Sequence, residues 1–303
     1  MTTSRVLSVG GVIDGTGGPI RRDVILEIKG GRIVGIRRTE ADVTPRKKAV
    51  EDLSGCTLLP CFVDAHVHLS MSGSTAERLR RCQLSRFYEE AQPIIERHLK
   101  EHLSCGVLAV RDGGDYGGYA HRYRREFLYR RGLPVVLQSA GRAWHAPGRY
   151  GGLVGCVPPD GHTLAHSIRE TRGETDVIKI VNSGINRLSA FEKETPPQFR
   201  PRKLKSAVRE GERLGLKTMV HVNGYDAVKE AIKAGCHSVE HGFFMGQDNH
   251  KRLGDRGIVW VPTAFTMEAY ARALPPGRSI PPNAPLITSS INPGVTAPGT
   301  IDS

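Results

Sequence analysis

Two histidines separated by one residue, His66 and His68, end an apolar stretch that begins at residue 58. In a β-strand, side chains two positions apart share a face, so both imidazoles would project in the same direction from the strand end. Neutral imidazole is the commonest metal ligand, and a rigid strand loses little entropy when it presents two of them to an ion. The pair indicates a metal site, although two of twelve histidines can also fall at this spacing by chance.

Three further donor side chains lie within or near the end of apolar stretches. Lys179 is flanked by apolar residues in 177–181, where a lysine on an inward strand face is costly unless it gains a partner or loses its charge. His221 and His241 lie near the ends of two later stretches. Taken singly, each histidine is more typical of a hydrogen-bonded structural residue. Lys179 alone is more typical of a lysine whose ammonium group reaches solvent at the strand end. Five donors at predicted strand ends together indicate a metal centre.

The elements that would position these residues begin at residue 58, where short apolar stretches start to alternate with charged helical segments. This alternation predicts βα units and a parallel sheet, in an α/β fold of the (β/α)8 TIM-barrel type. Seven strands can be placed before residue 263, so the barrel is expected to be incomplete at its eighth unit. After the histidine strand, strands are predicted at 107–112, 134–140, 176–181, 217–222, 237–241 and 257–262, and helices near 85–104, 118–131, 160–172, 201–214, 225–234, 247–255 and 266–274.

The chain outside the predicted barrel differs from it in composition. Residues 1–58 read as a small, β-sandwich-like unit, with strand-like segments and a predicted glycine hairpin at Lys29-Gly-Gly-Arg32. The barrel is predicted to occupy 59–274. Residues 275–303 are expected to be irregular, because seven prolines between 275 and 298 remove backbone donors.

Composition narrows the class of protein. The formal net charge is +12, and the basic clusters at 78–86, 122–131 and 200–205 fit solvated helix faces. A nucleic-acid-binding protein is a weaker alternative because no aromatic platform or binding motif accompanies them. No apolar run is long enough to span a membrane, and no signal peptide is visible, so a cytoplasmic location is expected. Six scattered cysteines without a paired motif predict reduced, mostly buried thiols.

Four segments of the chain resemble, in order, the metal-binding strands of the amidohydrolase superfamily. The resemblance covers about residues 4–270 and is nearest to the imidazolonepropionase-like branch, which includes Xaa-Pro and Xaa-Arg dipeptidases. It implies a hydrolase that uses a metal-activated hydroxide to cleave a C–N bond, amide or peptide-like, in a small or dipeptide-like substrate. The four segments are 62–68, 177–184, 220–223 and 239–242.

The resemblance also implies a cofactor set of two divalent metal ions, with zinc as the expected metal. His66 and His68 would hold the first ion, and His221 and His241 would hold the second. Lys179, carbamylated by CO2, would bridge them. Burial favours this modification because an amine reacts with CO2 only when it is neutral, and burial lowers the pKa of lysine.

Other residues receive roles from the resemblance. His145 would contact the substrate carbonyl oxygen or the tetrahedral intermediate. Arg142, Arg149 and Tyr150, in the same loop, could hold a substrate carboxylate or be ordinary surface residues. Asp302 lies in a segment with a faint likeness to the final, aspartate-bearing strand of the family.

Because the likeness around Asp302 is imperfect and the sequence stops one residue later, we expect a chain that is incomplete at its C-terminus. An alternative to an active hydrolase is therefore a truncated metal-binding homologue with impaired catalysis. A basic nucleic-acid-associated protein is a third, weaker interpretation, and assembly into a homo-oligomer stays open.

Overall fold

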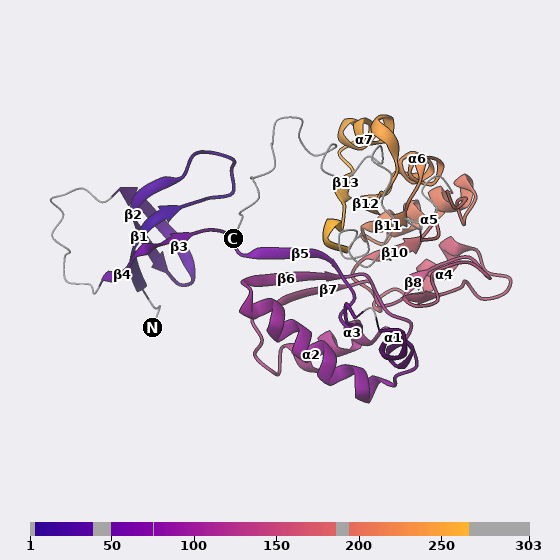
Figure 1. Cartoon of the computed structure of the whole chain (residues 1–303), viewed down its shortest axis with the longest axis horizontal. Helices are drawn as coiled ribbons and strands as arrows, with labels where there is room; N and C mark the ends of the chain where they lie inside the picture. The colour runs from indigo at the N-terminus through magenta and orange to yellow at the C-terminus, as the bar shows by residue number, and fades with distance from the viewer. Residues whose placement is uncertain (1–3, 39–49, 75, 186–193, 267–303) are drawn as a thin grey trace, which may run out of the picture. The chain divides into compact units, whose positions relative to one another are not determined.

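The chain folds into two compact units, Met1–Phe62 and Val63–Ser303, in the computed structural model shown in Figure 1. The structure describes residues 4–38, 50–74, 76–185 and 194–266. The predicted boundary at residue 58 precedes the division at Phe62 by four residues. The predicted tail at 275–303, and the predicted helix at 266–274 apart from its first residue, lie outside the described residues.

The first unit contains a four-stranded mixed sheet with the strand order β3-β2-β1-β4. Strand β1 pairs antiparallel with β2 and parallel with β4. Alternating residues such as Leu7 and Val9 bury one face of the sheet, as the two-residue period of a strand requires. Gly30 and Gly31 turn the predicted hairpin with φ of 57° and 74°, which confirms the turn. The strands are β1 (Ser4–Val12), β2 (Arg21–Lys29), β3 (Arg32–Arg38) and β4 (Val50–Leu58).

The second unit contains parallel strands in two sheets, with the orders β5-β6-β7 and β13-β12-β11-β10-β8-β9. The described strands do not close into a barrel. The strands are β5 (Phe62–Val67), β6 (Val107–Asp112), β7 (Val136–Ser139), β8 (Ala143–Trp144), β9 (Gly155–Cys156), β10 (Ile178–Val181), β11 (Thr218–Val222), β12 (Ser238–His241) and β13 (Val259–Val261). The helices are α1 (Glu77–Leu84), α2 (Tyr88–Ser104), α3 (Tyr119–Tyr123), the π-helical turn η1 (Arg124–Leu128), α4 (Leu164–Glu170), α5 (Pro201–Arg213), α6 (Tyr225–Ala234) and α7 (Gly246–Asp255).

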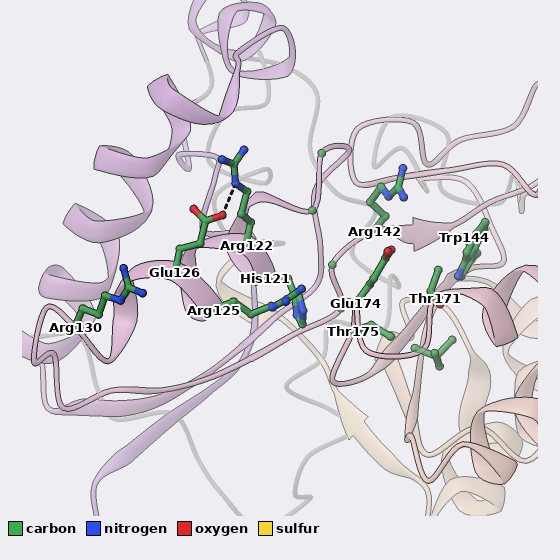
Figure 2. A pocket seen from close by; sticks show the side chains of 15 residues that line it. His121, Arg122, Arg125, Glu126, Arg130, Arg142, Trp144, Thr171, Glu174 and Thr175 are labelled. Carbon is green, nitrogen blue, oxygen red and sulfur yellow. Dashed lines mark hydrogen bonds and ion pairs between the residues drawn. The ribbon is translucent and has the colours of Figure 1, made fainter.

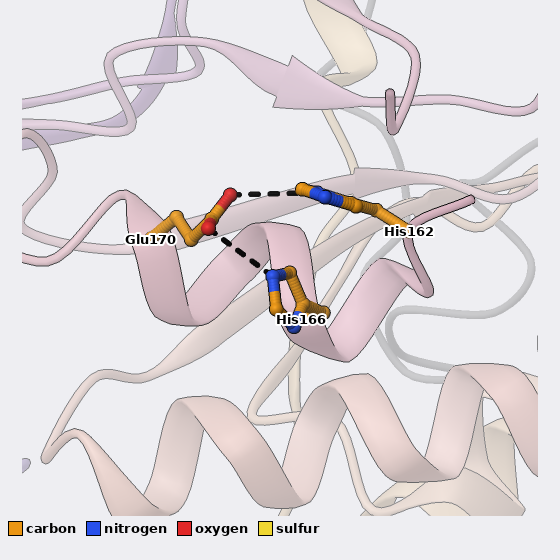
Figure 3. Close-up of side chains that lie close together, drawn as sticks. All are labelled: His162, His166 and Glu170. Carbon is orange, nitrogen blue, oxygen red and sulfur yellow. Dashed lines mark hydrogen bonds and ion pairs between the residues drawn. The ribbon is translucent and has the colours of Figure 1, made fainter. Parts of the chain in front are cut away.

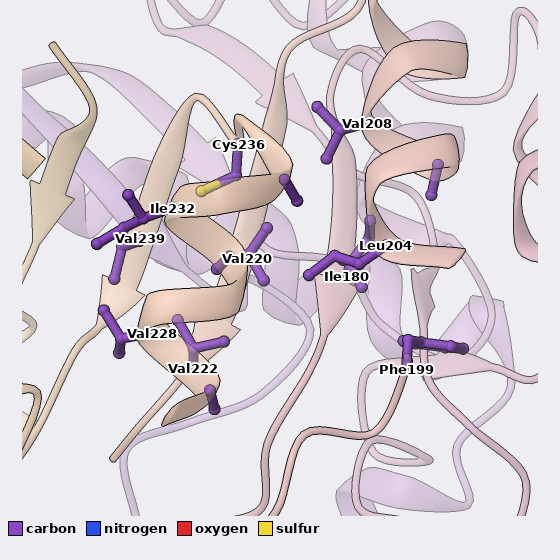
Figure 4. Packing of buried hydrophobic residues seen from close by; sticks show 14 of the residues in the cluster. Ile180, Phe199, Leu204, Val208, Val220, Val222, Val228, Ile232, Cys236 and Val239 are labelled. Carbon is purple, nitrogen blue, oxygen red and sulfur yellow. The ribbon is translucent and has the colours of Figure 1, made fainter. Parts of the chain in front are cut away.

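Each sheet of the second unit has its own hydrophobic core. Helices α2 and α3 pack on the three-stranded sheet, and α4 to α7 pack on the larger sheet. Figure 4 shows the part of this core that α5 and α6 form with β10, β11 and β12. Every residue of β11 is buried, as expected for a parallel strand that is covered on both faces. Burying an aliphatic side chain such as Val220 completely contributes about 1.5–3 kcal/mol, so these cores fix the strands that carry the candidate donors.

Several sequence predictions differ from the structure. The predicted helix at 118–131 is divided into α3 and η1, and strands β4, β8 and β9 were not predicted. The prediction of mostly buried cysteines is wrong. All six are free thiols, but Cys56, Cys61, Cys82 and Cys105 are exposed. A small side chain packs equally well at a surface strand or helix end, so residue type alone did not fix their burial.

The described residues agree with the expectation that the basic clusters are solvated. Basic side chains of the predicted clusters, such as Arg78, Arg125 and Arg202, are exposed to solvent. In the described part of the chain, no helix is both long and apolar enough to cross a membrane.

Candidate metal centre

Four imidazoles from three strands form a contiguous group in the second unit. His66 and His68 come from the end of β5, His221 from β11 and His241 from the end of β12. Ring centroids lie 5.4 Å apart for His66 and His68, 4.8 Å for His66 and His241, and 4.5 Å for His221 and His241. Parallel strands of one sheet end at a common edge, which brings His221 and His241 together, and the two sheets meet at His66 and His241, which are 175 positions apart in the sequence.

One ring nitrogen in each histidine of the β5 pair is already engaged. His66 Nδ1 lies 2.6 Å from a carboxylate oxygen of Glu240, and His68 Nδ1 donates to the backbone carbonyl of Gly114 at 2.7 Å. Since a carbonyl oxygen only accepts, the neutral His68 ring carries its proton on Nδ1. Nε2 of His66 is buried and has no hydrogen-bond partner within the described residues. Nε2 is therefore the nitrogen of this pair that is free to bind a metal ion.

The two later histidines are held by backbone and hydroxyl groups. His241 Nδ1 lies 2.7 Å from the hydroxyl oxygen of Thr263. His221 is held in the opposite sense, because its Nε2 donates to the carbonyl of Gly184 at 3.3 Å. His221 would therefore present Nδ1 to a ligand, whereas His241 would present Nε2.

Lys179 lies on β10 and is only 2% exposed. Its Nζ has no hydrogen-bond partner in the part of the chain that the structure describes. Burial lowers the pKa of Lys179 to about 8, while Glu240 opposes this shift. The fraction of neutral amine at pH 7 therefore rises by about two orders of magnitude over that of an exposed lysine. An unpaired, partly neutral amine in this position fits a nucleophile for CO2 better than it fits a structural ion pair.

Burial also keeps the four imidazoles neutral. Burial lowers the pKa of His68 to about 4 and of His221 to about 3, and the Lys179 ammonium group adds to both shifts. The pKa values of His66 and His241 are lowered well below the usual value, again mainly by burial. Because metal ions bind only unprotonated imidazole, these histidines are in the ligating form at neutral pH.

A buried charged group joins the two sheets beside the imidazoles, and the sequence analysis did not identify it. Glu240, fully buried on β12, contacts His66 through one carboxylate oxygen and accepts from Arg111 of β6 at 2.9 Å through the other. Arg111 also donates to the backbone of Ala65 and to Ser238. The carboxylate orients the His66 ring and raises its basicity, as such partners of metal-binding histidines do. The sequence signal that could have identified Glu240 was its place immediately before His241.

Asp112, at the end of β6, brackets His68. Its carboxylate accepts from the backbone N–H groups of Leu69 and Gly114 at 2.8 and 2.9 Å. Burial, followed by the neighbouring Asp115, raises the pKa of Asp112 to about 7. Gly113, between these contacts, has no room for a side chain, since an added Cβ would lie 2.9 Å from His68 Cε1. The loop after β6 therefore fixes the ring of His68 on two sides.

The backbone at the end of β12 is strained. His241 has a φ of 67° and Thr263, its hydrogen-bond partner, a φ of 48°. Left-handed backbone costs a non-glycine residue about 1–2 kcal/mol. Such strain persists where the surrounding structure holds a residue in place and is frequent at functional sites.

His145 follows β8, which pairs with β10 through Trp144 and Ile180. It is 8% exposed, and its Nδ1 donates to the backbone carbonyl of Ala146 at 3.1 Å. With Nδ1 engaged in this way, the ring can donate from Nε2 only when both nitrogens carry protons. His145 thus lies at the same strand-end edge as the other predicted residues of the larger sheet.

The remaining predicted residues are dispersed. The Tyr150 ring lies 5.5 Å from that of His221. Arg149 is exposed and donates to the backbone carbonyl of Pro196 at 2.9 Å. Asp302 lies outside the described residues.

Arg142 is exposed and lines a separate pocket of about 420 Å³ (Figure 2). His121, Arg125 and Arg130 line the same pocket, and none of the clustered imidazoles does. Tyr150 therefore lies beside the imidazoles, whereas Arg142 lies in a separate pocket that other basic side chains also line.

The residues at the strand ends fit divalent metal ions on the chemistry of the donors themselves. Two buried polar atoms, His66 Nε2 and Lys179 Nζ, lack partners within the described residues, and burying such atoms without a partner is costly. The imidazoles are neutral and present one free nitrogen each. Nitrogen donors of this kind suit borderline divalent cations.

The fold and the donor set define a TIM-barrel-like α/β protein with clustered candidate metal ligands at the ends of its strands. Residues 57–269 match the model of the amidohydrolase family. Because that match spans more than two thirds of the sequence, the chain belongs to the amidohydrolase family, as its motifs predicted.

Known relatives cover parts of this chain. Ochratoxinase from Aspergillus niger is 30% identical over 136 residues, which are 45% of this chain and 28% of that enzyme. An uncharacterised protein of Mycobacterium tuberculosis is 25% identical over 217 residues, which are 71% of this chain and 53% of that protein. The matched part thus spans only about a quarter to a half of these relatives.

Solved structures confirm the TIM-barrel-like α/β class. A Xaa-Pro dipeptidase with methionine in its active site superposes with a TM-score of 0.72 at 23% identity, covering 89% of this chain and 69% of that one. The crystal structure of A. niger ochratoxinase gives a TM-score of 0.70 at 21% identity, covering 89% and 67%.

Proposed function

We propose that this chain is a metal-dependent amidohydrolase that cleaves a C–N bond, amide or peptide-like, in a small substrate. The observation that carries the proposal is the meeting of four neutral imidazoles with one buried, unpaired lysine amine. Membership of the amidohydrolase family supports the proposal, and so does the similarity to an ochratoxinase and to a Xaa-Pro dipeptidase. A dipeptide or an N-acyl amino acid is accordingly the substrate class to test first.

The chain would hold two divalent ions, with zinc as the expected metal. His66 and His68 would bind one ion, and His221 and His241 the other. Lys179 would carry a carbamate between them, because burial supplies the neutral amine that CO2 requires. The ions would polarise a carbonyl and lower the pKa of a water molecule.

The protein's own groups would complete the reaction site. Glu240 would hold the His66 ring in its metal-binding orientation through the contact at 2.6 Å. His145, as an imidazolium, would donate from Nε2 to the carbonyl oxygen as negative charge develops on it. Tyr150 and Arg149 would contact the substrate beyond the scissile bond, with Arg149 exchanging its backbone partner for a carboxylate. Asp302 remains the candidate for proton transfer to the leaving amine.

The test combines metal analysis with a hydrolysis assay on the full chain. The protein is reconstituted with zinc and bicarbonate and assayed against a panel of dipeptides and N-acyl amino acids. Hydrolysis that depends on zinc, and that is lost in His66→Ala with His68→Ala, is expected. Metal bound at the four histidines without turnover would instead support the catalytically impaired homologue. Salt-dependent retention on nucleic acid without metal binding would overturn the proposal in favour of a nucleic-acid partner.

A further inference from the structure

A second group of metal-binding side chains lies on the surface of the second unit, at helix α4. Its members are His162, His166 and Glu170, all exposed to solvent (Figure 3). One ligand atom from each residue lies within 4.8 Å of the ligand atoms of the other two. Within the described ranges, no other three histidine, cysteine or carboxylate side chains bring their ligand atoms within 4.8 Å of one another. It shares no residue with the candidate metal centre.

The geometry of the group combines one helix face with the loop before it. His166 and Glu170 are four residues apart in α4, so their side chains project from one face in successive turns, and His162 lies two residues before the helix begins. One carboxylate oxygen of Glu170 lies 3.1 Å from His166 Nε2, and the other lies 3.4 Å from His162 Nδ1. The two rings meet edge to face with their centroids 4.3 Å apart. A single His–Glu ion pair needs only one ring, so the second ring is not explained by pairing alone.

The backbone beneath these side chains is held by hydrogen bonds and by packing against the core. The hydroxyl of Thr163 caps the helix by accepting from the backbone N–H of His166 at 3.2 Å. His162 is fixed by a backbone hydrogen bond to Pro159 at 3.0 Å. On the inner face of the helix, Ile168 is fully buried in the core of the larger sheet. Ligands on a capped and anchored helix are pre-organised, which favours ion binding.

We propose that His162, His166 and Glu170 form a peripheral site for a borderline divalent cation such as zinc, nickel or copper. Two imidazoles and one carboxylate are donors that these ions take, whereas magnesium and calcium prefer oxygen alone. Three protein ligands leave a coordination position for water or for a donor from another molecule. The proposal is independent of the proposed hydrolysis, because none of the three residues lies among the strand-end donors.

Zinc titration of the metal-free full-length protein tests the site. Wild-type protein is expected to bind one more equivalent of zinc than the variant His162→Ala with His166→Ala. Both substitutions are at exposed positions, and circular dichroism verifies that the variant folds. The control is His250→Ala, which removes another exposed helical histidine and is expected to leave the stoichiometry unchanged.

A second pair of variants separates this site from the candidate metal centre. His66→Ala with His68→Ala is expected to keep the peripheral equivalent of zinc and to remain bound to an immobilised nickel resin. Adding His162→Ala and His166→Ala to that variant is expected to abolish both signals. Equal zinc stoichiometry and affinity in wild type and in the α4 double variant would overturn the proposal and reduce the group to a surface ion pair.

Discussion

The second unit contains two histidine groups made from the same kind of side chain, and burial is what separates them. His66 is 5% exposed, and its partner Glu240 is 174 residues away in the sequence. His162 and His166 are 35% and 45% exposed, and their partner Glu170 lies within eight residues. The buried group therefore depends on the packing of distant strands, whereas the surface group depends on one short helix and the loop before it.

The difference has an electrostatic consequence. In the strand-end group, burial lowers the pKa values of all four histidines, so the imidazoles are neutral, and lowers the pKa of Lys179, so part of its amine is neutral. On α4, solvent surrounds the donors and screens their charges. The same ligand type would thus serve chemistry at one place and simple ion binding at the other.

The largest expected effect distinguishes the two groups by activity. Replacing His66 and His68 with alanine should reduce hydrolysis by at least about 10³-fold, since it removes an ion that would lower the pKa of bound water from 15.7 to about 7. Replacing His162 and His166 with alanine should leave the rate unchanged. Steady-state kinetics with metal analysis measures both. Equal losses in the two variants would contradict the distinction.

The next prediction concerns the cost of burying Lys179. In metal-free protein its folded pKa is about 8 against 10.5 for a free lysine, so between these values the unfolded chain holds a proton that the folded chain lacks. The free energy of unfolding should therefore increase by about 3 kcal/mol as the pH rises through this window, and decrease by the same amount as the pH falls through it. Chemical denaturation of Lys179→Met should lack this component. An exposed lysine replaced in the same way, Lys203→Met, should retain it, and an identical pH profile for wild type and Lys179→Met would refute the prediction.

A smaller effect is expected at the carboxylate that orients His66. Glu240→Gln should weaken zinc binding at the strand-end group by about 10–100-fold, as loss of such a partner does at other metal sites. Competition with a chelator measures the affinity. Glu230→Gln, which removes only the surface pair with Lys233, is the matched control. Unchanged zinc affinity in Glu240→Gln would show that the carboxylate has no positioning role.

The smallest effect tests how tightly the buried ring of His68 is enclosed. Gly113→Ala places a methyl group 2.9 Å from His68 Cε1 and should destabilise the fold by about 1–3 kcal/mol, with weaker zinc binding. Gly254→Ala, in helix α7 with no atom within 4 Å of the added methyl group, should stabilise the protein by up to about 1 kcal/mol. Thermal unfolding compares the two. Unchanged thermal stability in Gly113→Ala would mean that the loop after β6 shifts to accommodate the methyl group.

The sequence was sufficient to predict the strands that bear the donors, because each donor lies within or at the end of a short apolar stretch that can be recognised locally. It was also sufficient for the hairpin at Gly30 and Gly31, where the residue type dictates the turn. It could not reveal the contact of Arg111 with Glu240, since nothing local marks a partner 129 residues away. Strands of two residues, such as β8 and β9, are too short to show any period.

The backbone of His241 has an implication for the history of the chain. Glycine is the residue that adopts a φ of 67° without penalty, so every generation that retains histidine there forgoes a more stable alternative. A descendant released from using this imidazole should drift to glycine and unfold at a higher temperature. The residue at position 241 would therefore distinguish relatives that still use this imidazole from relatives that no longer do.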